Sequence, residues 1–205
     1  MVKSKGTLYI IAAASGTGKT SLSQALSQSV ESIKISVSHT TRPIRSNEQD
    51  GKHYFFTTPE KFKLLIHQEA FLEYAQLFNY YYGTSIQFVE EQLNAGFDII
   101  LNIDWQGARQ VKSKIKCTSI FLLPPSVAEL RIRLEKRNRE GADIIKQRLA
   151  SARFEISHYK EFDYVIINDK FENALADLRA IVHSKKLLLY HQIIKHNRLL
   201  KELLR

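Results

Sequence analysis

The stretch Ala13-Ala14-Ser15-Gly16-Thr17-Gly18-Lys19-Thr20 decides the fold, because it joins an apolar, β-branched run to a helical pattern. Gly16 and Gly18 permit positive φ, so the backbone N–H groups of this turn can face an anion. Lys19 supplies a point charge for β- and γ-phosphates, and the Thr20 hydroxyl suits Mg²⁺. Residues 13–20, called the phosphate loop below, therefore predict a site for the phosphates of a nucleoside triphosphate.

Ala13 departs from the general pattern of this loop, which begins with a glycine. A tight turn without a ligand is the alternative interpretation, but the Lys-Thr pair and the strand–helix frame favour the phosphate site. The loop alone does not separate kinases from GTPases or ATP-driven machines.

Strand-like runs alternate with helical patterns outward from this loop, which predicts an α/β fold with a parallel sheet covered by helices on both faces. A last helical pattern begins near Phe171 and extends, with a break, toward the end of the chain. The expected strands are residues 7–13, 33–37, 98–103, 118–122 and 164–167, and the other expected helices are 19–30, 105–114, 127–137 and 144–157.

Composition excludes several classes of protein. The 205 residues are 44% hydrophobic, which is enough for one globular domain. One cysteine, Cys117, rules out an internal disulfide and a cysteine-rich metal site. No apolar run approaches the roughly 20 residues of a membrane span, and the N-terminus lacks the cleavage pattern of a signal peptide. We therefore expect a soluble protein of the cytoplasm.

The net charge of +9 is unevenly distributed. Residues 109–153 carry 12 basic and 4 acidic side chains, and residues 183–205 carry 6 and 1. Local positive charge favours a polyanionic ligand, which could be a nucleotide, a nucleic acid or a membrane surface. Charge alone does not choose among them.

Two segments interrupt the alternation of strands and helices. Residues 39–84 are too long and too rich in Tyr and Phe for a loop, so they predict a small inserted subdomain. The short, charged segment 135–143, which contains Gly141, is interpreted as a flap.

The insert also contains residues suited to a phosphorylated acceptor. Arg42 and Arg45 lie three apart, with Tyr54 nine residues later, a spacing that suits a clamp on a phosphate monoester. Glu73 follows in the segment Phe71-Leu-Glu-Tyr. A carboxylate is the natural partner of guanine, because N1–H and the 2-amino group are both donors.

These segments, taken together, resemble the guanylate kinase family. The resemblance extends from about residue 6 to residue 183 and keeps the order and spacing of the family's motifs. It is carried by the phosphate loop and by the segments SVSHTTRPIR (36–45), FLEYAQ (71–76), YYGT (81–84), NIDWQG (102–107) and LPPS (123–126).

The resemblance implies the P-loop nucleoside monophosphate kinase fold, with a parallel sheet flanked by helices, an inserted GMP-binding subdomain and a short lid. The kinase-like domain would span residues 5–183, followed by a basic amphipathic helix over 184–205. Its core would comprise residues 5–38, 98–125 and 158–183, with the insert at 39–90 and the lid at 126–157.

The resemblance also implies a reaction: transfer of the γ-phosphoryl group of Mg·ATP to GMP, and to dGMP, giving ADP and GDP. The phosphate of GMP would be held by Arg42, Arg45, Tyr54 and Tyr82, and guanine would be read by Ser38, Glu73, Thr84 and Asp104. Packing of Tyr54 and Tyr82 is the alternative for those two side chains.

On the ATP side, the resemblance assigns the phosphates to residues 13–20 (Ala13, Ala14, Ser15, Gly16, Thr17, Gly18, Lys19 and Thr20). Lys19 would be catalytic together with three lid arginines, Arg133, Arg137 and Arg148, which close over the phosphates. Asn168 matches a family position near the adenine; an Asx turn is its alternative. Thr20 would bind Mg²⁺, with Asn102 or Asp104 reaching the metal through water.

Two departures from the family pattern bear on these expectations. Asn102 stands where the family usually has aspartate, so Mg²⁺ affinity or the reaction rate is expected to fall below the family's. The proline of the arginine clamp, Pro43, lies next to the first arginine rather than the second, which adjusts only the turn.

Other classes of function remain as alternatives. A guanylate-kinase-like scaffold that binds proteins would typically degrade the phosphate loop or the acceptor arginines, which this chain keeps. A kinase for a ribose phosphate would not need Ser38, Glu73 and Thr84. The basic tail would suit nucleic acid, but no recognised binding module accompanies it, so we expect neither nucleic acid nor a membrane as partner. The tail could instead form a homo-oligomer contact.

Overall fold

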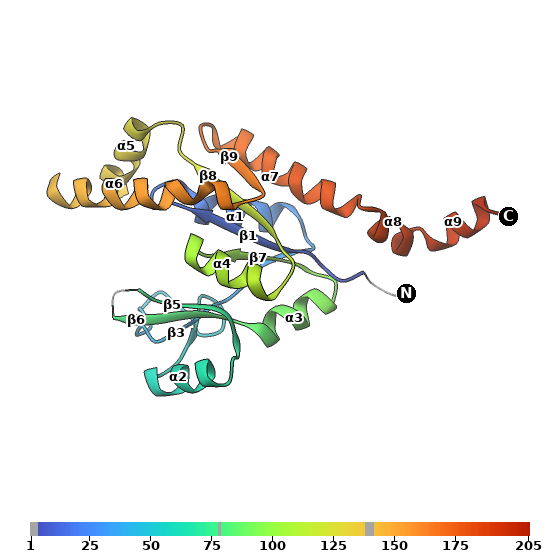
Figure 1. The fold of residues 1–205 in the computed structure, drawn as a ribbon, viewed down its shortest axis with the longest axis horizontal. Coiled ribbons are helices and arrows are strands. Elements are labelled where there is room, and N and C mark those ends of the chain that lie inside the picture. The colour runs from blue at the N-terminus through green and yellow to red at the C-terminus, as the bar shows by residue number, and fades with distance from the viewer. Residues whose placement is uncertain (1–3, 78, 138–141) are drawn as a thin grey trace.

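The computed structural model describes residues 4–77, 79–137 and 142–205. Five parallel strands form the main sheet in the order β2-β7-β1-β8-β9 (Figure 1). The strands are β1 (Leu8–Ala13), β2 (Ile33–Ile35), β7 (Asp98–Asn102), β8 (Thr118–Leu123) and β9 (Tyr164–Ile167). The predicted α/β class with a parallel sheet is confirmed, although β2 ends two residues earlier than expected.

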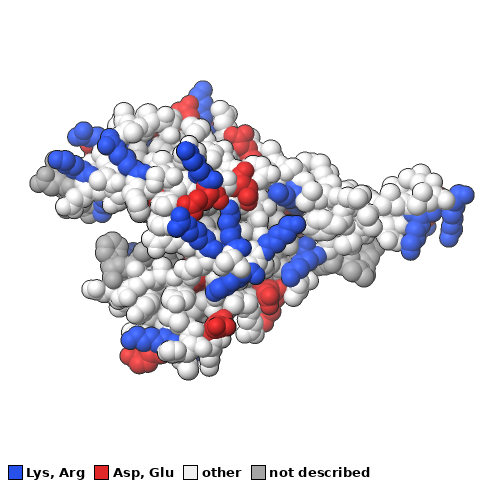
Figure 2. All heavy atoms as spheres, viewed as in Figure 1, with Lys and Arg blue, Asp and Glu red and all other residues white. Residues whose placement is uncertain are grey.

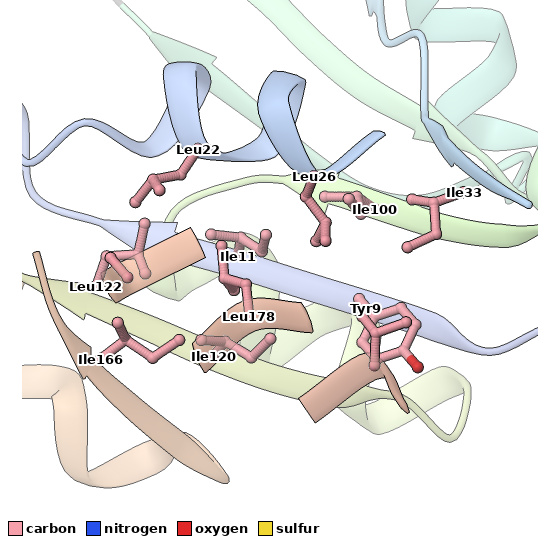
Figure 3. Close-up of a cluster of buried hydrophobic side chains, with 12 residues drawn as sticks. Tyr9, Ile11, Leu22, Leu26, Ile33, Ile100, Ile120, Leu122, Ile166 and Leu178 are labelled. Carbon is pink, nitrogen blue, oxygen red and sulfur yellow. The ribbon is translucent and has the colours of Figure 1, made fainter. Parts of the chain in front are cut away.

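Helices cover both faces of this sheet. On one face α1 (Lys19–Ser29) and α7 (Phe171–Lys186) pack against alternate strand residues, with Leu22 and Leu178 meeting Ile11 in the core (Figure 3). On the other face α3 (Ile86–Asn94) and α4 (Trp105–Lys114) cover the intervening residues, such as Ile10. Burial on both sides explains why the strands are continuous apolar runs.

Residues 39–85 form a second, four-stranded sheet, β4-β3-β6-β5, with one helix. Its aromatic residues make its own small core: the Phe62 ring stacks on those of Phe71 and Tyr81, with ring centres 4.6 and 5.3 Å away. The elements are β3 (His39–Thr40), β4 (Phe55–Phe56), α2 (Pro59–His67), β5 (Phe71–Leu77) and β6 (Tyr80–Ser85). This sheet lies below the main sheet in Figure 1.

Two further helices lie above the main sheet in Figure 1, α5 (Val127–Arg137) and α6 (Ala142–Ser157), followed by a short 3-10 turn, η1 (His158–Glu161). Leu130 and Leu134 of α5 and Ala152 of α6 bury Ala14, so these helices pack directly on the phosphate loop. The expected flap, 135–143, lies partly outside the described residues.

The expected break in the last helical pattern is present, and it divides the helix predicted over 184–205 into two short helices. α7 stops at Lys186, Leu188 takes an extended conformation (φ −57°, ψ 140°), and α8 (Leu189–Lys195) and α9 (Asn197–Leu203) follow. Neither Gly nor Pro marks the break, so no local signal could locate it. Among the described residues, none of the helices combines the length and apolar character needed to cross a bilayer.

Candidate active site

The phosphate loop turns from the end of β1 into the start of α1. Gly16 and Gly18 have φ of 85° and 97°, the left-handed values that glycine adopts without strain. Among the described residues Glu69 alone shares positive φ without being glycine, so Ala13 has ordinary strand geometry. A glycine is therefore not required at this first position. The first turn of α1 leaves backbone N–H groups free to meet an anion.

Lys19 is held by a backbone carbonyl and lies within electrostatic reach of three carboxylates. Its Nζ donates a hydrogen bond to the carbonyl oxygen of Ile103 at 3.0 Å. Burial lowers the pKa of the Lys19 ammonium, while the negative charges of Asp104, Glu155 and Glu73 act in the opposite direction. The ammonium therefore lies between the phosphate loop and the acceptor side, where a transferred phosphoryl group would carry negative charge.

The end of β7 is held by side-chain hydrogen bonds rather than by charge. The Ser23 hydroxyl on α1 donates to Oδ1 of Asn102 at 2.6 Å. Oδ1 of Asp104 accepts the backbone N–H of Gly107 at 2.8 Å and so caps the N-terminus of α4. Thr20 is exposed at the start of α1. The Thr20 hydroxyl and the second oxygen of Asp104 are therefore candidate oxygen ligands for a metal.

On the acceptor side, Glu73 of β5 and Thr84 of β6 form a buried pair. They face each other in the antiparallel register, and the Thr84 hydroxyl donates to Oε1 of Glu73 at 2.5 Å. Burial, helped by the charge of Asp104, raises the pKa of the Glu73 carboxyl to about 7. A Cβ on Gly107 would lie 3.1 Å from Oε2, so this glycine leaves room for the carboxylate.

The arginine clamp is organised around Glu48. Arg42 donates to Oε1 of Glu48 at 2.7 Å, which raises the pKa of Arg42 and lowers that of Glu48. The rings of Tyr54 and Tyr82 lie 6.0 Å apart, with the Arg42 guanidinium 5.4 Å from the Tyr54 ring. Arg45 is exposed, and its backbone N–H binds the second Glu48 oxygen at 2.9 Å.

Ser38 is half-buried directly before β3, and its carbonyl accepts the N–H of Phe55. β3 pairs with β6, so Ser38 enters the same small sheet as Thr84 and Tyr82. The structure thus brings Ser38, Tyr82, Glu73 and Thr84 to one small sheet, whereas Asp104 lies between β7 and α4.

The three lid arginines have different surroundings. Nε of Arg133 binds Glu129 at 2.8 Å, and its Nη1 binds the carbonyl oxygen of Asn168 at 3.0 Å. Arg148 is half-buried on α6. Arg137 ends α5, but its side chain lies outside the described residues.

Asn168 is fully inside the molecule, with 5% of its surface exposed. Its Nδ2 donates to the carbonyl oxygen of Thr17 in the phosphate loop at 2.7 Å, and its backbone N–H binds Leu123. Its side-chain contact is therefore with the loop, 151 residues away in sequence, rather than with its own turn.

Sequence reasoning missed Glu155. Its carboxylate accepts the N–H of Ser15 in the phosphate loop, and burial raises its pKa. A signal was present: Glu155 lies seven residues after Arg148 and three after Ala152, on one helical face. That signal becomes meaningful only once Ala152 is known to pack under the loop.

Comparison with known proteins gives one family throughout. The family described as Guanylate kinase matches residues 5–185. The chain is 49% identical over 205 residues to the guanylate kinase of Buchnera aphidicola subsp. Schizaphis graminum, covering 98% of this chain and 99% of the relative. It is 49% identical over 203 residues to that of Vibrio parahaemolyticus, covering 98% of each. The crystal structure of guanylate kinase from Anaplasma phagocytophilum matches with a TM-score of 0.73 at 32% identity, covering 92% of this chain and 90% of that one.

Proposed function

The chain belongs to the guanylate kinase family, and we propose that it transfers the γ-phosphoryl group of Mg·ATP to GMP, and to dGMP, through the residues described above. It is a nucleoside monophosphate kinase with guanylate kinase activity. The observation that supports the choice of acceptor is the buried Glu73–Thr84 pair, whose carboxylate interacts with Lys19 of the phosphate loop. This interaction supports a guanine site that lies next to the triphosphate site.

The protein promotes this reaction mainly by positioning the two substrates and stabilising charge. An oxygen of the GMP phosphate attacks the γ-phosphorus while the bond to the β-phosphate oxygen breaks, giving GDP and ADP. The attacking phosphate is already anionic, so no strong general base is needed. Residues 13–20 hold the triphosphate, and Lys19 stabilises the charge on the transferring group.

Acceptor recognition divides between charge and hydrogen bonding. Ionised Glu73 accepts the N1–H and 2-amino donors of guanine, and Ser38, Thr84 and Asp104 complete the contacts with the base. The GMP phosphate is held by Arg42, Arg45, Tyr54 and Tyr82. Glu48 holds Arg42 in place before GMP arrives, which reduces the ordering cost of binding. The lid arginines Arg133, Arg137 and Arg148 then supply positive charge from above.

The metal fits the oxygen donors that are present. Mg²⁺ prefers oxygen ligands and keeps several waters, so it arrives with the triphosphate rather than in a cage of carboxylates. Thr20 would bind it directly, with Asp104 or Asn102 acting through water. The metal would neutralise the β- and γ-phosphate charge during transfer. We place this reaction in the cytoplasm, in purine nucleotide metabolism and GMP recycling.

The proposal is tested by ADP formation from Mg·ATP with GMP, dGMP, AMP, UMP, CMP and ribose phosphates supplied separately. Turnover confined to GMP and dGMP is expected. Activity on a different acceptor would keep the kinase and reject the role of Glu73. Folded, ATP-binding protein without activity on any acceptor would support the scaffold alternative instead.

We also propose that a second copy of the chain covers the tail, residues 187–204. Large apolar side chains are exposed along it, and Leu189, Leu203 and Leu204 are 75%, 72% and 88% exposed. The tail extends from the body of the molecule, with Lys and Arg side chains at its far end (Figures 1 and 2). Such a surface marks an interaction site.

Light scattering after size exclusion tests this contact. A chain ending at Lys186, and a full-length Leu189→Gln, Leu203→Gln variant, should both have half or less of the wild-type mass. An unchanged mass in both would reject the tail as the contact.

A further inference from the structure

Asn168 makes a specific link to the phosphate loop, and the roles assigned to the loop so far do not use it. The side-chain Nδ2 of Asn168 donates a buried hydrogen bond to the carbonyl oxygen of Thr17 at 2.7 Å. It also fits against Gly18, where a Cβ would lie 2.6 Å from Nδ2. Two constraints therefore require glycine at position 18: its φ of 97° and the closeness of the Asn168 amide.

The hydrogen bond controls the direction of one peptide unit. The C=O of Thr17 and the N–H of Gly18 belong to the same plane, and in a trans peptide they point in opposite directions. Holding the carbonyl toward Asn168 therefore directs the Gly18 N–H away from Asn168. Two glycines near this unit give the backbone freedom to rotate it, so an anchor is needed to keep one orientation.

The main chain of Asn168 makes a second link, to the lid. Its carbonyl oxygen accepts Nη1 of Arg133 at 3.0 Å. Arg133 belongs to α5, whose Leu134 side chain would lie 3.0 Å from a Cβ on Gly16. One residue at the end of β9 thus connects the phosphate loop with the helix that carries a lid arginine.

We propose that Asn168 is a positioning residue that orients the Thr17–Gly18 peptide for the triphosphate, rather than a residue that reads adenine. This inference rests on the proposed use of the loop for ATP phosphates. It differs from base recognition in a measurable way. A positioning residue affects every ligand that carries the phosphate chain, whereas a base reader affects only adenine nucleotides.

The experiment compares Asn168→Ala with wild type, measuring the binding of Mg·ATP and of Mg·tripolyphosphate by calorimetry in the absence of GMP. Loss of a buried hydrogen bond should weaken both ligands by the same factor, about tenfold or more. Asn94→Ala, an exposed asparagine at the end of α3, is the matched control and should bind both normally. Thermal melting confirms that each variant is folded.

Asn168→Asp supplies a second readout. At pH 8 an ionised carboxylate would face the Thr17 carbonyl and repel it. At pH 6 a buried aspartic acid, with its pKa raised by desolvation, can regain a proton and donate. Tripolyphosphate affinity relative to wild type should therefore improve as the pH falls, and Asn94→Asp should show no such recovery.

Weaker ATP binding with unchanged tripolyphosphate binding would overturn the proposal and restore the adenine contact. Unchanged binding of both ligands by folded Asn168→Ala would overturn it too. Since neither measurement requires GMP, a failure of the proposed acceptor chemistry would be seen separately.

Discussion

The phosphate loop is built from consecutive residues of one turn, whereas the insert, residues 39–85 in the structure, assembles its polar groups from separate strands and loops. In the loop, the groups that would meet phosphate are mainly backbone N–H groups and one lysine. In the insert they are side chains, and the buried carboxyl of Glu73 has a pKa of about 7. Backbone N–H groups bind the phosphates of a nucleotide whatever its base, whereas side chains can select guanine.

This comparison predicts that damage to the loop removes turnover while sparing acceptor binding. Lys19→Ala should lower turnover by roughly a thousandfold, because the charge of the transferring phosphoryl group loses its main cation. GMP affinity, measured by calorimetry, should change little. The exposed Lys116→Ala is the matched control for loss of one positive charge. Near-normal turnover of Lys19→Ala would contradict the role of the loop.

A substitution in the insert should weaken acceptor binding and leave ATP binding intact. Glu73→Gln places an amide N–H₂ where guanine needs an acceptor, so GMP affinity should fall by roughly a hundredfold while ATP affinity is retained. Exposed Glu90→Gln controls for the change of charge. Equal losses of ATP and GMP affinity would show that the two sites are not separable in this way.

The same carboxyl predicts a pH dependence of GMP binding. With a pKa of about 7, Glu73 is largely protonated at pH 6 and cannot accept from both guanine donors. Wild-type GMP affinity, from calorimetry between pH 6 and 8.5, should therefore rise with pH. The GMP affinity of Glu73→Gln should not rise with pH in this way. If the affinities of both proteins rise equally with pH, a group other than Glu73 causes the dependence.

Protein stability should respond in the opposite direction to binding. The pKa is raised from 4.5 to about 7, so the folded protein holds the proton more tightly than the unfolded chain. The contribution of Glu73 to stability thus falls as pH rises from about 4.5 to about 7, by about 1.4 kcal/mol per pKa unit. Glu73→Gln should raise the Tm at pH 8 and change it little at pH 5. An equal change at both pH values would show that ionisation is not the cause.

The smallest expected effect concerns Asn102. Asn102→Asp restores a negative charge near the proposed metal and can keep the hydrogen bond from Ser23. The Mg²⁺ concentration for half-maximal rate should fall about fivefold, as expected for a modest gain in attraction. Asn94→Asp adds the same charge at an exposed position and should not change it. An unchanged Mg²⁺ requirement in Asn102→Asp would remove this residue from the metal's surroundings.

The sequence predicts the phosphate loop more completely than it predicts the insert. The strand, turn and helix around residues 13–20 follow from local pattern, and helices 105–114 and 127–137 were predicted with the bounds that the structure has. The insert was recognised as an interruption, but the pairing of Glu73 with Thr84 required a strand register. The breaks around α8 follow no residue pattern, since neither Gly nor Pro stands at residues 187–188 or at residue 196.

The sequence by itself determined the α/β class and the phosphate loop, and through family motifs it predicts the acceptor residues, because these depend on order and spacing along the chain. The tertiary structure decided the rest. Burial raised the pKa of Glu73, α4 took one oxygen of Asp104 as its cap, and the end of β9 brought Asn168 against Thr17. Such properties arise from desolvation and from contacts between residues far apart in sequence, which no local pattern encodes.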